Sequence, residues 1–280
     1  MRRPTCLAAI AALLLRSCVP LAAQPEVDAR PNERNAPRDT ISRTRYNDRI
    51  DVLSAGAEFV ASGGGGSFFE QYGRLGGEQN DLGTYTALAL TGRIALSDDL
   101  RITGHAAYHT AGFEELYDVR SGTDPRTPAI AGVSERFSVL AVPLIAGIEF
   151  APIRTQFTSY VGAGAGLALT QVNWLSSVEY ANAGYVRPQS NTESFGVAPV
   201  LRAYAGLDLR FDRGSIAKAA FRGIYFEAAY TFLPVSRDFF AELRSRGRGI
   251  ESAPETDDAA LYLGGLSFTF GLNLQVLRRQ

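Results

Sequence analysis

The stretch LSFTFGLNL at residues 266–274 decides the fold. Large apolar side chains stand at its even positions, and small or polar side chains stand at the odd positions between them. Successive side chains of a β-strand point to opposite faces of the sheet. This period of two therefore predicts a strand with one apolar and one polar face.

The same alternation recurs along the rest of the chain. One face of each segment carries Leu, Ile, Val, Phe or Ala, and the other carries Gly, Ser, Thr, Tyr and isolated charges. The further segments with this pattern are residues 53–62, 88–96, 100–109, 140–150, 160–170, 201–210 and 223–232. With residues 266–274 they predict an all-β protein of eight strands, each of about ten residues.

Composition narrows the class of protein. The chain has 280 residues, a net charge of -1 and 20% charged residues, which argues against a partner such as nucleic acid. A hydrophobic content of 46% excludes disorder for most of the chain. The 28 Gly, 12 Tyr and 16 Phe favour sheet over a helix bundle.

The N-terminus reads as a targeting segment. Arg2 and Arg3 precede an apolar run at residues 7–15, and small residues follow, so we expect residues 1–23 to be a secretory signal peptide. Residues 24–49 are rich in Pro and mixed charges and predict a disordered periplasmic leader. Both cysteines, Cys6 and Cys18, fall in the predicted signal. The mature chain would then lack disulfides and thiolate zinc sites.

The connections between the predicted strands alternate in length. Long ones are expected at residues 63–83, 110–134, 171–193 and 233–259, and shorter ones at 97–99, 151–156 and 212–220. Long loops on one rim and short turns on the other are typical of an up-and-down antiparallel transmembrane β-barrel, whose short turns and termini face the periplasm. Ten strands are the alternative if residues 178–186 pair as a further hairpin.

Two other architectures compete with a membrane barrel. A soluble lipocalin-like barrel would bind a ligand inside and expose many Lys and Glu outside, but the chain has one lysine, Lys218. A helical membrane protein needs about eighteen uninterrupted apolar residues. The best segment, residues 137–150, contains Ser138, Pro143 and Glu149. The transmembrane barrel is the preferred interpretation.

Two neighbouring stretches, VPLIAGIEFAP at 142–152 and YVGAGAGLAL at 160–169, resemble the fourth and fifth strands of the small OmpA-like and OmpW-like outer-membrane β-barrels. The resemblance covers about residues 50–276. It implies a barrel domain in the outer membrane of a Gram-negative bacterium, with membrane lipids and the barrel assembly machinery as partners. Such barrels usually end in an aromatic residue, whereas this chain continues past Phe270 to Gln280, so Phe270 would have to act internally.

The polar faces predict what fills the barrel. Eight charged residues lie on them, four basic and four acidic: Glu58, Arg93, Arg101, Glu149, Arg202, Asp208, Arg210 and Glu227. Buried charges need partners, so we expect a cross-barrel ion-pair network. Eight strands leave an interior just wide enough for side chains, which favours a plugged lumen over the alternative of a charged pore constriction.

The two histidines raise the question of catalysis. His105 and His109 share the lumenal face of one predicted strand, and acidic residues there could complete an acid/base site. The lipid-modifying hydrolases of this architecture place a serine two residues after the histidine, and here that position is Ala107. Four residues of strand separate the histidines by about 13 Å, too far for one metal ion. We therefore expect no enzyme, no metal and no cofactor, with an outer-membrane hydrolase as the competing hypothesis.

Loops and strand ends complete the expectations. Lipopolysaccharide phosphates are candidate ligands of Arg244, Arg246 and Arg248 in the last long loop, and the preceding long loop is expected to hold Trp174 and Tyr180.

Glycines in the strands, such as Gly162, predict close packing against large side chains such as Tyr204. Aromatic residues at strand ends should form interfacial girdles: Tyr108, Phe150, Phe157, Phe195, Phe211 and Phe232. The expected role is non-catalytic: structural, surface interaction or small-solute passage.

Overall fold

The computed structural model describes residues 51–62, 65–121, 129–152, 156–182, 189–211, 221–235, 239, 243 and 259–276. The predicted signal peptide and leader lie outside these residues. So does most of the last long loop, including the three arginines predicted to bind lipopolysaccharide.

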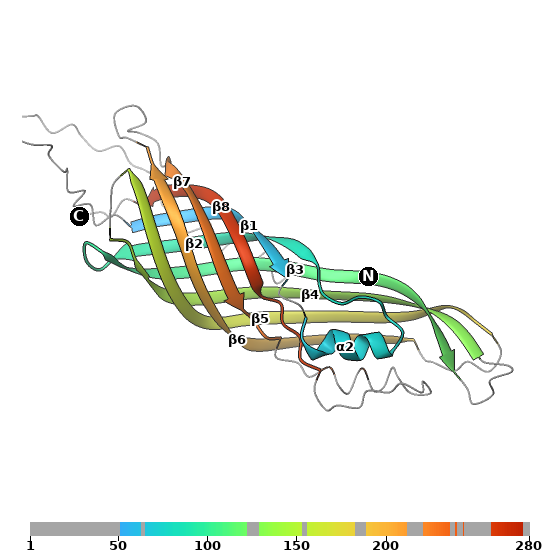
Figure 1. Ribbon diagram of the computed structural model, residues 1–280. Coiled ribbons are helices and arrows are strands. Elements are labelled where there is room, and N and C mark those ends of the chain that lie inside the picture. The colour runs from blue at the N-terminus through green and yellow to red at the C-terminus, as the bar shows by residue number, and fades with distance from the viewer. Residues whose placement is uncertain are drawn as a thin grey trace, which may run out of the picture. The chain divides into compact units, whose positions relative to one another are not determined.

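Eight antiparallel strands form a closed barrel in chain order, as the sequence predicts (Figure 1). The elements are β1 (Asp51–Ser62), α2 (Ser67–Arg74), β2 (Thr84–Ala95), β3 (Leu100–Ser121), β4 (Ala129–Phe150), β5 (Phe157–Ala181), β6 (Ser190–Arg210), β7 (Phe221–Phe232) and β8 (Gly265–Val276). β1 closes the ring by pairing with β8, where Ala57 lies opposite Phe270. The alternative of ten strands is wrong, because residues 178–181 continue β5.

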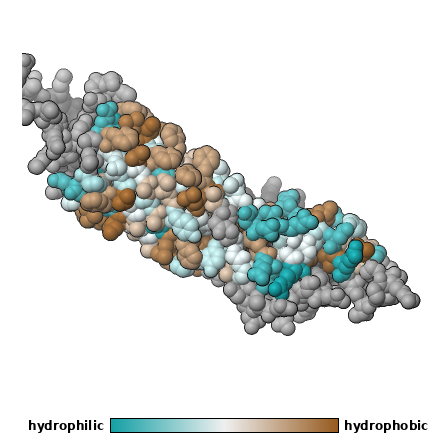
Figure 2. All heavy atoms as spheres, in the orientation of Figure 1, coloured by the Kyte–Doolittle hydropathy of each residue, from teal (hydrophilic) through white to brown (hydrophobic). Residues whose placement is uncertain are grey.

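The apolar faces of the strands point outward. Phe226 and Leu207 are 45% and 39% exposed, whereas their sequence neighbours Glu227 and Asp208 are each 3% exposed inside the barrel. Figure 2 shows apolar side chains over the barrel and polar ones toward the far end of the long strands. A soluble barrel would have the opposite arrangement, so this exterior is suited to lipid. No helix among the described residues is long and apolar enough to cross a membrane.

The six aromatic residues predicted at strand ends all face outward, but Tyr108 and Phe195 lie within the long strands β3 and β6 and not at their ends. The exposed set comprises Tyr108, Phe150, Phe157, Phe195, Phe211 and Phe232. Phe270 on β8 also faces outward. Amphipathic or aromatic rings at this position suit the boundary between acyl chains and headgroups.

Four strands are much longer than the sequence analysis predicts. β3, β4, β5 and β6 have 22, 22, 25 and 21 residues, whereas the other four have 12 each. The predicted loops at 110–134 and 171–193 are therefore wrong over most of their length. Trp174 and Tyr180 lie on β5 and not in a loop. The extra residues form a four-stranded extension, about ten residues or about 30 Å beyond the apolar band.

The polarity of both faces reverses where the extension begins. The inward face of β3 runs from polar to apolar residues: Arg101, Thr103, His105 and His109, then Ala111, Phe113, Tyr117 and Val119, with Glu115 an exception. Its outward face runs from apolar to charged residues: Ile102, Ala106 and Tyr108, then Glu114, Asp118 and Arg120, with Leu116 an exception. The pairing with β4 keeps one register along this whole length, apart from residues 107–108. The reversal therefore results from the order of the residues along β3, without any change in its register against β4.

The apolar inner face of the extension is covered by α2 and by described residues that follow β7: Leu233, Val235, Phe239, Leu243, Ala259, Leu261 and Leu263. Phe68 of α2 lies 5.1 Å from Phe137 of β4 and 5.5 Å from Trp174 of β5, measured between ring centroids. Phe239 joins the same cluster, with its ring centroid 5.1 Å from that of Phe68 and 5.9 Å from that of Phe137. We call this second core, outside the apolar band, the cap core. A helix of eight residues has little stability alone, so these ring contacts hold α2 in place.

Tyrosines in the lumen lie against glycines on neighbouring strands. A Cβ atom at Gly162 would lie 2.4 Å from Tyr204 Cζ, and one at Gly206 would lie 2.3 Å from Tyr160 Cζ. The predicted packing of Tyr204 against Gly162 is confirmed. Because glycine has no side chain, these positions leave room for the tyrosine rings in the narrow interior.

This packing makes a quantitative prediction. Gly162→Ala should lower the free energy of unfolding by about 1–3 kcal/mol, because the new methyl group overpacks the lumen. The matched control is Gly104→Ala, since no atom lies within 4 Å of a Cβ at that outward position. Urea unfolding in lipid vesicles, followed by the fluorescence of the single Trp174, measures both. Equal effects of the two substitutions would contradict the packing account.

Candidate functional site

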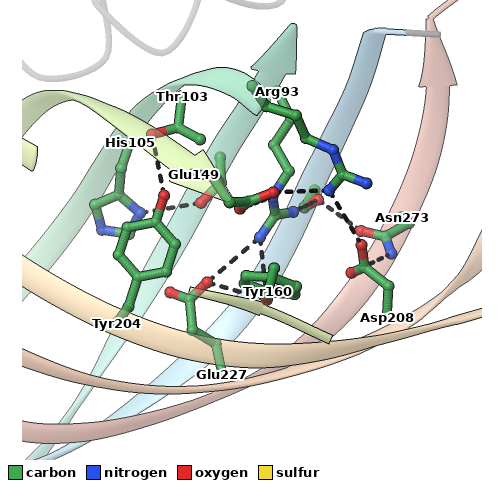
Figure 3. A network of polar contacts seen from close by, with 12 residues as sticks. Arg93, Thr103, His105, Glu149, Tyr160, Tyr204, Asp208, Glu227 and Asn273 are labelled. Carbon is green, nitrogen blue, oxygen red and sulfur yellow. Dashed lines mark hydrogen bonds and ion pairs between the residues drawn. The ribbon is translucent and has the colours of Figure 1, made fainter. Parts of the chain in front are cut away.

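The eight charged residues of the polar faces all lie inside the barrel. They come from six strands: Glu58 on β1, Arg93 on β2, Arg101 on β3, Glu149 on β4, Arg202, Asp208 and Arg210 on β6, and Glu227 on β7. Seven of them are buried, and Arg210, at the short-turn rim, has a side chain that is 19% exposed. The structure joins all eight by ion pairs. Figure 3 shows the part of this network around Arg93, with Glu149, Asp208 and Glu227.

Arg93 is the centre of the network. Its Nε donates to Glu149 at 2.9 Å, and its Nη2 lies 3.3 Å from Glu227 on the far side of the lumen. Ser54 Oγ and the Tyr160 hydroxyl accept further hydrogen bonds from the same guanidinium, at 2.7 and 3.1 Å. The carbon at its centre lies 4.8 Å from the centroid of the Tyr160 ring. This distance suits a cation–π contact.

A second group of ion pairs lies toward the rim of short turns. Arg101 Nη1 lies 2.7 Å from Glu149 and 3.6 Å from Asp208. Asp208 also accepts a hydrogen bond from Asn273 Nδ2 at 3.2 Å, and Arg210 lies 4.0 Å from it. Glu149 is thus shared between two arginines, which joins this group to Arg93.

A third group crosses the lumen between β1 and β6. Arg202 Nη1 donates to Glu58 at 2.8 Å, and Nη2 donates to Glu227 at 3.0 Å. Ser267 Oγ donates to Glu58 at 2.6 Å. Every acid of the set therefore contacts at least one arginine, which offsets part of the free-energy cost of burying these charges. Side chains from opposite walls meet across the interior and fill it.

The two histidines lie beside this network on β3. His105 is 8% exposed, and its Nδ1 lies 3.0 Å from Thr91 Oγ1. His109 packs edge-on against Tyr85, with 5.8 Å between ring centroids. The part of the chain that the structure describes contains no group of three His, Cys, Asp or Glu residues placed to hold a metal ion.

The cap core is the feature that the sequence analysis missed. Within it, Glu135 accepts hydrogen bonds from Trp174 Nε1 and from the Tyr117 hydroxyl, the latter at 3.2 Å. Burial raises the pKa of the Tyr72 phenol well above its ordinary value, and nearby Tyr117, Glu135 and Glu115 add to the effect. Tyr72 therefore remains neutral at any physiological pH. Part of the signal was present as the apolar residues Val133, Phe137 and Val139 at alternate positions, at and just after the end of the predicted loop 110–134.

The ion-pair network predicts an asymmetric response to mutation. Arg202→Ala should cost about 3–5 kcal/mol of unfolding free energy, because it leaves Glu58 buried without its guanidinium partner. Arg136→Ala is the matched control: Arg136 pairs with Glu114 at 2.5 Å on the outer face, where both side chains are about two-thirds exposed (65% and 66%). An exposed pair contributes about 0.2–1 kcal/mol. Urea unfolding in vesicles measures both, and a comparable loss in the two variants would refute the network as a stabilising element.

Comparison with known proteins finds similar solved structures. No family model matches the chain, and no curated protein matches its sequence. One similar structure is Ail, the attachment invasion locus protein of Yersinia pestis, with 13% identity over 81% of this chain and 99% of that chain and a TM-score of 0.35. A second is the outer membrane protease OmpT from Escherichia coli, with 8% identity over 85% of this chain and 99% of that chain and a TM-score of 0.36. A third is the N-terminal β-barrel domain of OprF from Pseudomonas aeruginosa, with 11% identity over 80% of this chain and 96% of that chain and a TM-score of 0.25. At these identities the likenesses give no function to this chain.

The protein's own geometry defines its class. A closed ring of strands, an apolar exterior bounded by aromatic residues and a polar, charge-paired interior are the properties of outer-membrane barrels. The chain is an eight-stranded β-barrel of the outer-membrane type.

Proposed function

We propose that this protein is a plugged, non-catalytic outer-membrane barrel that works by presenting a rigid surface for interaction outside the cell. The reversal of polarity along β3–β6 carries the proposal. Long loops of outer-membrane barrels face outward, so the extension, which lies on the long-loop side, projects from the cell. Its own apolar core gives it a fixed shape that a set of mobile loops would lack.

The filled lumen supports a plug over a pore. Arg93 and Glu227 reach each other from β2 and β7, and Arg202 and Glu58 reach each other from β6 and β1. Ions would have to pass between paired charges held at hydrogen-bond distance. The preferred role is therefore surface interaction, and small-solute passage is the weaker alternative.

The outer face of the extension is polar and internally braced. Glu114 pairs with Arg136 between β3 and β4, and Gln171 Nε2 donates to Glu193 at 3.0 Å between β5 and β6. The Tyr180 ring lies against Gly132, and its hydroxyl donates to Asp118. These links join the four strands side to side through surface side chains. The face thus offers a partner fixed carboxylates, amides and a guanidinium.

The two histidines give only limited support to the alternative that the protein is an outer-membrane hydrolase. The hydroxyl group next to His105 belongs to Thr91, and both residues are enclosed within the barrel. A lipid or peptide substrate would have to displace the packed ion pairs to reach them. Lipid contact is proposed for the outward aromatic residues, and binding of lipopolysaccharide by Arg244, Arg246 and Arg248 stays a prediction.

Site-specific labelling and conductance test the proposal together. Among the described residues there is no cysteine, so Ser177→Cys and Glu193→Cys on the extension should react with a membrane-impermeant maleimide on intact cells. Asp98→Cys, in a short turn, is the matched control and should react only after the outer membrane is opened. The purified wild-type protein should give no step conductance in planar bilayers. Reaction of Asp98→Cys alone on intact cells would reverse the orientation, and regular conductance steps would replace the plug with a pore.

A further inference from the structure

A small cavity lies in the middle of the lumen, beside the ion-pair network. Its volume is about 10 Å³, which is room for about one water molecule. Most of the side chains around it are polar: Thr91, Thr103, His105, Arg202, Tyr204 and Glu227. The surface role proposed above does not use this cavity, and the inference below is independent of that role.

His105 lines this cavity, and one nitrogen of its ring lacks a hydrogen-bond partner within the described part of the chain. His105 Nε2 is buried and has no hydrogen bond to any described residue, although Nδ1 of the same ring lies 3.0 Å from Thr91 Oγ1. Buried polar atoms are almost always hydrogen-bonded to protein or to ordered water. The imidazole of His105 therefore needs a second hydrogen-bond partner, at Nε2, which the Thr91 hydroxyl does not reach.

The other groups around the cavity can bind a small polar molecule. The Tyr204 hydroxyl donates to Thr103 Oγ1 at 3.1 Å, which leaves lone pairs on both oxygens. Arg202 and Glu227 are paired with each other at 3.0 Å at the edge of the cavity. Apolar cavities stay dry, but a polar cavity of this size with several hydrogen-bonding groups holds water. Water also suits either tautomer of His105, because it both donates and accepts.

We propose that this cavity is a binding site for one water molecule, which hydrogen-bonds to His105 Nε2 and completes the plug. The water joins the imidazole and hydroxyl groups on β2 and β3 to the side chains of β6. Gly164 forms part of the wall, and a Cβ there would lie 2.7 Å from Ile145 Cγ2. The absence of a side chain at Gly164 keeps the space open.

Selective labelling offers a direct test, because the chain has two histidines. The full chain, labelled with ¹³C,¹⁵N-histidine and folded in lipid nanodiscs, should show a magnetisation transfer from long-lived water to the ring protons of His105. His105→Phe assigns the signal by removing it. Gly164→Ala should abolish the transfer to His105, because the new methyl group pushes Ile145 into the cavity. Gly104→Ala, at an open outward position, should leave it unchanged.

A second variant covers the case in which Gly164→Ala does not fold. Thr103→Val keeps the size of the side chain but removes a hydroxyl from the wall, and it should weaken the water contact of His105. Absence of a water contact in the wild-type protein would overturn the proposal. A contact that persists at full strength in folded Gly164→Ala, or in Thr103→Val where the former does not fold, would place the water elsewhere and overturn it as well. Neither result changes the labelling or conductance expected of the surface role.

Discussion

Every backbone N–H and C=O group that enters a bilayer must find its hydrogen-bond partner within the protein. This chain meets that constraint by pairing β1 with β8, so the sheet has no edge inside the apolar band. Closure fixes which face of each strand meets lipid and which meets the lumen. The alternation of side chains, the charge pairs and the aromatic boundary all follow from those two environments.

The four long strands, β3–β6, pass from the hydrocarbon of the bilayer into water, and the residues on their two faces change accordingly. Within the band, Ile102 faces lipid and Arg101 faces the lumen. Farther along β3, Asp118 faces outward and Tyr117 packs inward. Because the direction of the side chains is unchanged, the reversal marks the depth at which hydrocarbon gives way to water. It also produces two interiors in one sheet: a charged one inside the membrane, where arginines and acids can pair, and an aromatic one outside it, where α2 provides a cover.

Sequence reasoning predicted the barrel, its strand number and the eight lumenal charges because each depends on local alternation. Residues such as Glu58 and Arg93 stand out as isolated charges on faces of small and polar side chains. Their ion-pair partners could not be predicted from the sequence, because the contact of Arg93 with both Glu149 and Glu227 depends on the stagger of all eight strands. Phe137 and Trp174 were missed for another reason: their apolar face is the inward one, opposite to the pattern in the membrane. The helix α2 is too short to be recognised from periodicity alone and depends on those same rings.

Depth-resolved accessibility along the outward face of β3 tests the central claim most directly. Single spin labels at Ile102, Ala106, Glu114 and Asp118 can be compared in vesicles for collisions with oxygen, which concentrates in the bilayer, and with a water-soluble nickel complex. The reversal of polarity predicts preferential collision with oxygen at Ile102 and Ala106 and with nickel at Glu114 and Asp118. Oxygen-dominated collisions continuing through Glu114 and Asp118 would contradict it, as would nickel-dominated collisions at all four positions.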